Sequence, residues 1–250
     1  MKRAATASLP IATGDPTRIA EVRAALADVT DPELDESVVD LDFIARIDVD
    51  GDRVAVEFRL PTFWCSANFA WIMAEDMRSA LLALPWVGAA DIRLVDHFAA
   101  ERINAGVASA TGFAAAFAGE ATAGLAVIRD TFLKKAWLGR MARLIELLRA
   151  AGRTDAEIAA MPVIALRNLA AAAAPDVAAA ARRYLALRAV YGGPAGDSDP
   201  AFVTANGARL TAATFAAHLR DIRMTRRGVE ANGEMCRILL KGRYGGSPAR

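Results

Sequence analysis

The first part of the chain alternates between helical and extended hydrophobic patterns. Asp15-Pro16 is typical of a helix start, because the aspartate can cap free backbone N–H groups and proline fits the first helical turn. Apolar residues then recur at helical spacing to about Asp28. Residues 43–49 predict a strand, Asp50-Gly51-Asp52 a hairpin turn, and residues 54–60 a second strand in which apolar and polar side chains alternate.

A second helix and a third strand follow the hairpin. From about Ser66 the hydrophobic period becomes helical, and this pattern ends at Leu84-Pro85. Apolar and charged side chains alternate again over residues 91–94. The order helix, strand, strand, helix, strand predicts a small α+β domain over residues 16–100, in which the strands flanking the second helix are parallel if they are neighbours. Residues 1–15 are expected to form a flexible N-terminus.

The remaining residues, 101–250, show mainly helical patterns. One helix is predicted over residues 121–151, and Thr154-Asp155-Ala156-Glu157 is a capping-box sequence that opens another. Ala-Pro-Asp at 174–176 opens a third helix, and Thr211 begins a fourth. We therefore expect an all-α helical module after the α+β domain, with a role in recognising a client or partner.

Charge divides the chain in the same way. The first 100 residues contain 9 Lys and Arg against 17 Asp and Glu, whereas the rest contain 21 against 12. This asymmetry predicts two modules with different roles. The net charge of +1 gives no indication of a nucleic-acid partner, and no apolar run is suited to a membrane span. Two cysteines cannot form a disulfide framework, so we expect a reducing, cytoplasmic environment.

Cys65 lies where the second strand gives way to the second helix. Its sulfur is expected near unpaired N–H groups and the positive end of the helix dipole, which favour the reactive thiolate. Phe63 and Trp64 oppose this effect, because an apolar wall disfavours the charged form. The chemistry of this segment alone leaves two interpretations open: a reactive thiol and an inert, buried cysteine.

The other residues with chemical potential have simpler interpretations. Cys236 could be a second ligand or a resolving thiol, but a small apolar residue on a terminal helix is the simpler explanation. For His97 and His218 a hydrogen-bonded structural role is favoured. The sequence has no phosphate loop, dinucleotide fingerprint or Gly-x-Ser-x-Gly elbow, and it lacks the Cys and His pairs of a closed zinc site. A metal bound within one chain would therefore need carboxylates, a small ligand or a second subunit.

Several motifs of the first domain occur together in a known order. They are Val29-Thr30-Asp31-Pro32-Glu33-Leu34, Val39-Asp40-Leu41-Asp42-Phe43-Ile44, the Asp-Gly-Asp hairpin, and Pro61-Thr62-Phe63-Trp64-Cys65 with its following helix. By these motifs, residues 21–97 resemble the iron–sulfur (metal–sulfur) cluster assembly domain found in PaaD, in SufT and at the front of Mrp-type ATPases. The helical C-terminal extension has no such resemblance.

The resemblance implies a site. In that family the cysteine is a reactive residue implicated in handling iron or an iron–sulfur cluster, and Asp-Pro-Glu lies on a loop near it. Carried over, Cys65 is the metal-binding thiol, and Asp31, Glu33 and Thr62 are its neighbours in the cofactor-binding site. Asp31 and Glu33 also have a plain interpretation as turn and cap residues, which stays open.

The sequence also departs from the family pattern. Asp42 stands where the family usually has glycine, and this places a charge where the backbone normally turns freely. Trp64 and Ser66 replace the small residue and the proline that often flank the cysteine. We therefore expect a more crowded and apolar pocket around Cys65.

These observations favour an assembly factor over an enzyme. The leading hypothesis is a maturation factor that transiently holds iron or an iron–sulfur unit through Cys65 for a client metalloenzyme. PaaD-like relatives serve a bacterial multicomponent oxygenase with a di-iron site, so such an oxygenase is the expected client. A homodimer could supply ligands that one chain lacks. The alternatives are a metal-free scaffold or folding chaperone and, third, a thiol-transfer enzyme, for which a Cys-x-x-Cys pair is missing.

Overall fold

The computed structural model describes residues 11–118 and 124–245, which form two compact units. Unit 1 comprises the chain up to Arg129 together with Ala231–Arg250, and unit 2 comprises Asp130–Glu230. The chain passes between the units within two helices, α5 (Leu125–Ala150) and α9 (Ala212–Tyr244). The sequence predicts a single boundary near residue 100. The structure divides the chain differently, because the last part of the chain belongs to the same unit as the first.

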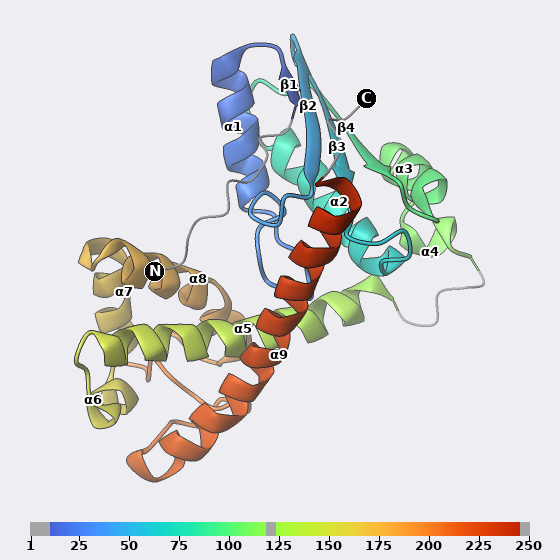
Figure 1. Ribbon diagram of the computed structural model, residues 1–250. Coiled ribbons are helices and arrows are strands. Elements are labelled where there is room, and N and C mark those ends of the chain that lie inside the picture. The colour runs from blue at the N-terminus through green and yellow to red at the C-terminus, as the bar shows by residue number, and fades with distance from the viewer. Residues whose placement is uncertain (1–10, 119–123, 246–250) are drawn as a thin grey trace. The chain divides into compact units, whose positions relative to one another are not determined.

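Unit 1 contains a four-stranded sheet with the order β1-β2-β3-β4 (Figure 1). The strands are β1 (Ile11–Thr13), β2 (Ile44–Asp50), β3 (Arg53–Arg59) and β4 (Ala89–Val95). The hairpin β2–β3 is antiparallel, and β3 and β4 are parallel, as the strand–helix–strand order predicts. The α+β class of this region and the helical class of the later region are therefore confirmed.

β1 was not predicted. It pairs in parallel with β2, and the Thr13 hydroxyl donates a hydrogen bond to the Asp48 carboxylate. Three residues are too few to show a recognisable alternation, so only the pairing reveals this strand. It lies within residues 1–15, which were expected to be flexible; residues 1–10 lie outside the described part of the chain.

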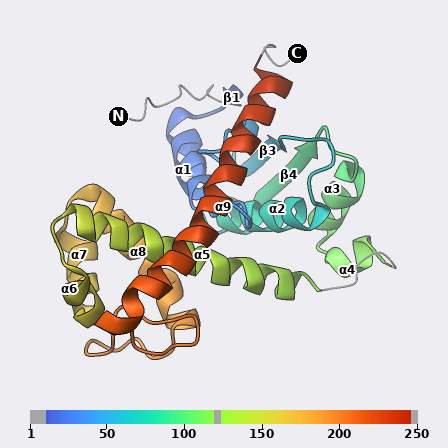
Figure 2. The same cartoon turned by 60° about the horizontal axis from the view of Figure 1, so that its bottom comes forward.

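The helices α1 (Pro16–Ala27) and α2 (Ala67–Leu82) pack against each other and against the sheet (Figures 1 and 2). α1 begins as predicted, since the Asp15 carboxylate accepts a hydrogen bond from the Arg18 N–H at 2.9 Å. The core of unit 1 is formed by buried apolar side chains from these helices and the inner face of the sheet. They include Val22, Leu26, Ile47, Val54, Val56, Phe58, Trp71, Met77, Leu81, Ile92 and Leu94.

Two further helices, α3 (Ala100–Ser109) and α4 (Phe113–Ala116), extend unit 1 beyond residue 100. The Asn104 side chain accepts a hydrogen bond from the Leu94 N–H at 2.8 Å and donates one to the Leu94 carbonyl at 3.0 Å. These bonds satisfy backbone groups on the open edge of β4, which would otherwise remain unpaired. The ring of Phe113 packs edge-on against Trp71 at a centroid distance of 5.5 Å.

Unit 2 is helical. It contains most of α5, the helices α6 (Asp155–Ala160), α7 (Val163–Ala172) and α8 (Pro175–Tyr191), and the first part of α9. The capping box of α6 and the start of α8 lie where the sequence predicts them, but α7 was missed. Buried Arg188 donates hydrogen bonds to the carbonyls of Gly193, Pro200 and Ala201, which ties the loop after α8 to this helix. No helix in the described part of the chain has both the length and the hydropathy of a membrane span.

Candidate functional site

Cys65 lies between the carboxyl end of β3 and the first turn of α2. Ser66 occupies the N-cap position of α2 without a side-chain cap bond, so Cys65 directly precedes the N-cap residue. Its side chain is half-buried, and its Sγ lies 3.1 Å from the Thr62 Oγ1. The location is therefore the one expected from the sequence, and Thr62 is a direct neighbour of the thiol.

The aromatic residues beside Cys65 do not enclose it. The Trp64 side chain is 75% exposed and that of Phe63 is 48% exposed. Both belong to the turn that joins β3 to α2, where side chains can extend into solvent. This differs from the expected crowded and apolar pocket, because the bulk that replaces the family's small residue is directed outward.

His97 fixes the backbone of Cys65. Its Nδ1 lies 3.2 Å from the Ala99 N–H, which can only donate, so Nδ1 accepts and the ring proton resides on Nε2. Nε2 then donates to the Cys65 carbonyl at 2.8 Å. Burial lowers the pKa of His97 and keeps the ring neutral. The residue has the hydrogen-bonded role expected from the sequence, and this role connects the end of β4 to the thiol segment.

Asp31 organises the loop that carries Glu33. One carboxylate oxygen of Asp31 accepts the N–H groups of Glu33 and Leu34, each at 2.9 Å. Burial raises the pKa of Asp31 to about 6, although these two hydrogen bonds favour the charged form. The structure thus shows Asp31 in its plain role as a turn residue. The Glu33 carboxylate instead accepts a hydrogen bond at 3.3 Å from the Asn232 amide, which belongs to α9.

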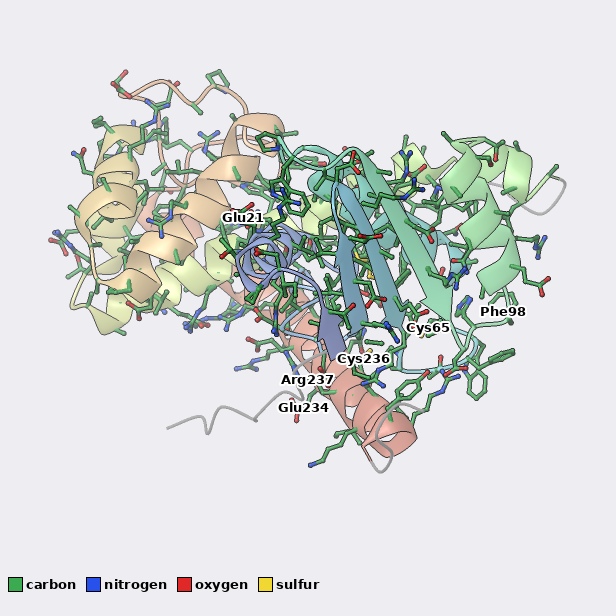
Figure 3. The ribbon with its side chains drawn as sticks, turned by 90° about the horizontal axis from the view of Figure 1, so that it is seen from above. Glu21, Cys65, Phe98, Glu234, Cys236 and Arg237 are labelled. Atoms are coloured by element: carbon green, nitrogen blue, oxygen red, sulfur yellow. The ribbon has the colours of Figure 1, made fainter. Side chains whose placement is uncertain are left out.

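The sequence interpretation of Cys236 as a simple apolar residue missed its surroundings. Burial, followed by the charges of Asp31, Cys65 and Glu33, raises the pKa of Cys236 to about 11. The charges of all three groups therefore act on Cys236, and Figure 3 labels both cysteines. The signal that could have found it is helical spacing, since buried Leu240 lies one turn further along α9.

The residues brought together here do not make a complete metal site. Across residues 11–118 and 124–245, no group of three or more His, Cys, Asp or Glu side chains is arranged to hold a metal ion. The available sulfur ligands are soft and suit iron, zinc or iron–sulfur units. The donor set therefore fits iron chemically, but it falls short of the four ligands of a closed tetrahedral site.

A cavity of about 500 Å³ opens beside Phe63 and the segment that follows β4. Its lining comprises Phe63, Asp96, His97, Phe98, Ala99, Ala100, Glu101 and Arg102. The Phe98 N–H donates to the Phe63 carbonyl at 3.0 Å, and the Phe98 side chain is 54% exposed. The thiol segment is thus bordered by exposed aromatic side chains on the side of this cavity.

The comparison with known families concerns the segment that contains Cys65. Residues 19–92 match the family model described as iron–sulfur cluster assembly protein. This segment is similar to iron–sulfur cluster assembly proteins. The match confirms the resemblance seen in the sequence, and it includes Asp31, Glu33, Thr62 and Cys65. It supports a general role in iron–sulfur cluster assembly.

The iron–sulfur cluster assembly match covers the sheet hairpin, α2 and most of α1, but ends before His97. Cys236 and all of unit 2 lie outside it. No curated protein matches the chain. The part of the site that α9 contributes therefore has no counterpart in the matched segment.

Proposed function

We propose that this protein is a maturation factor that holds or transfers iron or an iron–sulfur unit through Cys65. The observation that carries the proposal is a half-buried thiol, hydrogen-bonded to Thr62 at a helix start, within the segment similar to cluster assembly proteins. Cysteine thiolates are the common protein ligands of iron–sulfur clusters, and a helix N-terminus favours the thiolate.

The incomplete ligand set supports temporary binding. A cation held by few protein ligands keeps open positions for water, a small thiol or the ligands of a client, which allows transfer by ligand exchange. A second copy of the chain could also supply ligands, and a homodimer is part of this proposal. Such chemistry requires reduced thiols, as in a bacterial cytoplasm.

The proposed client is a metalloenzyme, specifically a carboxylate-bridged di-iron oxygenase of several components. Support comes from the resemblance of the first domain to PaaD-like factors, and fold analogy alone does not settle a client. Unit 2, which lies outside the matched segment, would supply recognition of that client. The proposed partners include neither nucleic acid nor membrane.

Anaerobic reconstitution tests the role of Cys65. The reduced full chain is incubated with ferrous iron and sulfide, desalted, and assayed for bound iron and sulfide. We expect Cys65→Ser to lose most of the bound iron, while Ser66→Ala, which keeps the thiol and removes a hydroxyl without a cap bond, binds as the wild type does. If Cys65→Ser and the wild type bind equal amounts of iron, metal binding through this thiol is refuted.

A second candidate function is a metal-free scaffold or folding chaperone. The exposed aromatic rings of Phe63 and Phe98, which line the cavity, and of Trp64 favour it, because exposed aromatic groups are typical of protein contact sites. In co-expression with a di-iron oxygenase, this function predicts that Trp64→Ala lowers client activity while Cys65→Ala leaves it unchanged. The maturation factor predicts loss of client activity with Cys65→Ala.

A further inference from the structure

The C-terminal part of α9 is attached to unit 1 on both sides of Cys236. Before Cys236, the Asn232 amide donates to Glu33, and directly after it Arg237 forms an ion pair with Glu36. Further along α9, Arg243 donates to the carbonyls of Leu60, at 3.3 Å, and Asp96, at 2.7 Å. The position of Cys236 is therefore fixed by contacts with the loop that follows α1 and with the ends of β3 and β4.

A buried apolar side chain and a cation–π contact accompany these bonds. Leu240, one helical turn after Cys236, is only 3% exposed and belongs to the core of unit 1. The guanidinium of Arg59 lies over the Tyr244 ring at 4.3 Å from its centroid. One face of α9, at helical spacing from Cys236 to Tyr244, thus packs on unit 1.

This attachment brings the two cysteines of the chain together. Cys65 follows β3 by six residues, at the same edge of the sheet to which Arg243 binds. Both cysteines are half-buried, both pack against the same core, and the two groups interact electrostatically. Figure 3 labels both cysteines, Cys65 in the segment before α2 and Cys236 on α9. Neither thiol is in a disulfide, so both are free to bind.

We propose that Cys236 is the second ligand of the cargo, so that Cys65 and Cys236 together form a two-thiolate site for a thiophilic cation such as ferrous iron. This inference rests on the proposed function and extends it to a residue outside the matched segment. On binding, each thiol releases one proton to solvent as its sulfur–metal bond forms, and the metal keeps its oxidation state. Two of four tetrahedral positions then remain open for exchange with a client.

The charges near the pair suit a cation. The carboxylates of Asp31 and Glu33 are close enough to act on Cys236, and their negative field would stabilise a bound divalent ion. A cysteine kept only as a small apolar side chain would gain nothing from these neighbours. The hydrogen bond between Glu33 and Asn232 holds one of these carboxylates on the segment of α9 that carries Cys236.

Cobalt(II) provides a test, because its sulfur-to-metal charge-transfer absorption grows with the number of bound thiolates. The reduced, full-length protein is titrated anaerobically, and the wild type is compared with Cys65→Ser, Cys236→Ser and the double variant. We expect each single variant to lose about half of the absorption and the double variant to lose all of it. Met235→Ser, an exposed neighbour on the same helix, is the matched control and should leave the absorption unchanged.

The outcomes separate this inference from the proposed function. Full absorption in Cys236→Ser with a loss in Cys65→Ser overturns the second ligand and leaves the role of Cys65 intact. Absence of absorption in the wild type overturns both the second ligand and the role of Cys65. A second measurement uses the wild type alone. Cobalt(II) should slow the alkylation of Cys236 by about tenfold or more when the site is nearly saturated. An unchanged alkylation rate at saturation would also refute the inference.

Discussion

The Asp31 carboxylate accepts two hydrogen bonds that stabilise its loop, but burial of this charged group lowers the free energy of unfolding. Its pKa rises from the ordinary value of 3.8 to about 6 in the folded protein, chiefly because the carboxyl group is buried. Between these pH values the folded state retains a proton that the unfolded state has lost, so the free energy of unfolding falls as the pH rises. A shift of about two units corresponds to roughly 3 kcal/mol, and this loss is complete above about pH 6.

Asp31→Asn should remove this cost and keep an acceptor oxygen for the N–H groups of Glu33 and Leu34. We expect the variant to be more stable than the wild type at pH 8 by about 1–3 kcal/mol, with the difference vanishing near pH 4. Urea unfolding at several pH values measures it. Asp91→Asn, at an exposed position of β4, serves as the control and should change neither quantity. An unchanged pH dependence in Asp31→Asn would exclude Asp31 as the titrating group.

Asp42 adopts a left-handed backbone conformation, with φ of +61°. The sequence comparison placed a glycine of the family at this position, and the backbone still makes the turn that glycine favours. We expect Asp42→Gly to be more stable than Asp42→Ala by about 1 kcal/mol, because only alanine has a Cβ that disfavours positive φ. Chemical denaturation of both variants measures the difference.

The same pair of changes at exposed Asp40, which has no positive φ, is the control. There alanine should be the more stable variant, since glycine loses more conformational freedom on folding. A preference for alanine at both positions would show that the conformation of residue 42 does not restrict the side chain.

Contacts between residues that are close in the sequence could be predicted from it. Thr62 and Cys65 are three residues apart, and their contact follows from the turn before α2. The outward direction of Trp64 depends on the exact turn geometry, which the hydrophobic pattern does not specify. The neighbours of Cys236 depend on packing between segments about 200 residues apart in the sequence, which no local pattern encodes.

The close packing of α3 against α2 requires a glycine at position 106. A Cβ on Gly106 would lie 2.7 Å from the Cζ3 of Trp71, whose buried ring also packs against Phe113. Gly106→Ala should therefore destabilise unit 1 by about 1–3 kcal/mol, because the ring has little room to move. Gly242→Ala is the matched control: it lies in α9 with open space around it and should be neutral or slightly stabilising. Equal stability of the two variants would contradict the close packing of α3 on α2.

Elements with strong periodic or capping signals were predicted, and those without them were missed. The hairpin β2–β3, the start of α1 and the capping box of α6 each combine a hydrophobic pattern with a residue that ends or begins the element. By contrast, α7 lies in an alanine-rich segment, where the apolar face has little contrast with the rest of the helix.

At the scale of the whole molecule, the sequence predicts two consecutive modules, whereas unit 1 is discontinuous. The ion pair of Arg237 with Glu36 joins residues that are 201 positions apart, and residues 130–230 form unit 2 between them. The charge asymmetry indicates two modules but contains no information on which end of the chain returns to the first. The burial of Leu240 and the ion pair of Arg237 with Glu36 show that the end of α9 completes unit 1.

Leu240 provides a test of this discontinuous unit. Leu240→Ala removes a side chain that is only 3% exposed in the core of unit 1, so we expect a loss of about 2–4 kcal/mol in its stability. Hydrogen exchange should show faster opening in β2, β3 and α2, with unit 2 protected as in the wild type. Lys241→Ala, at the exposed neighbouring position, is the control and should change stability by less than about 0.5 kcal/mol. Because Leu240 lies one turn from Cys236, the same change should also speed alkylation of Cys236. Unchanged exchange in unit 1 would mean that α9 is dispensable for its core, and the position of Cys236 beside Cys65 would lose its structural support.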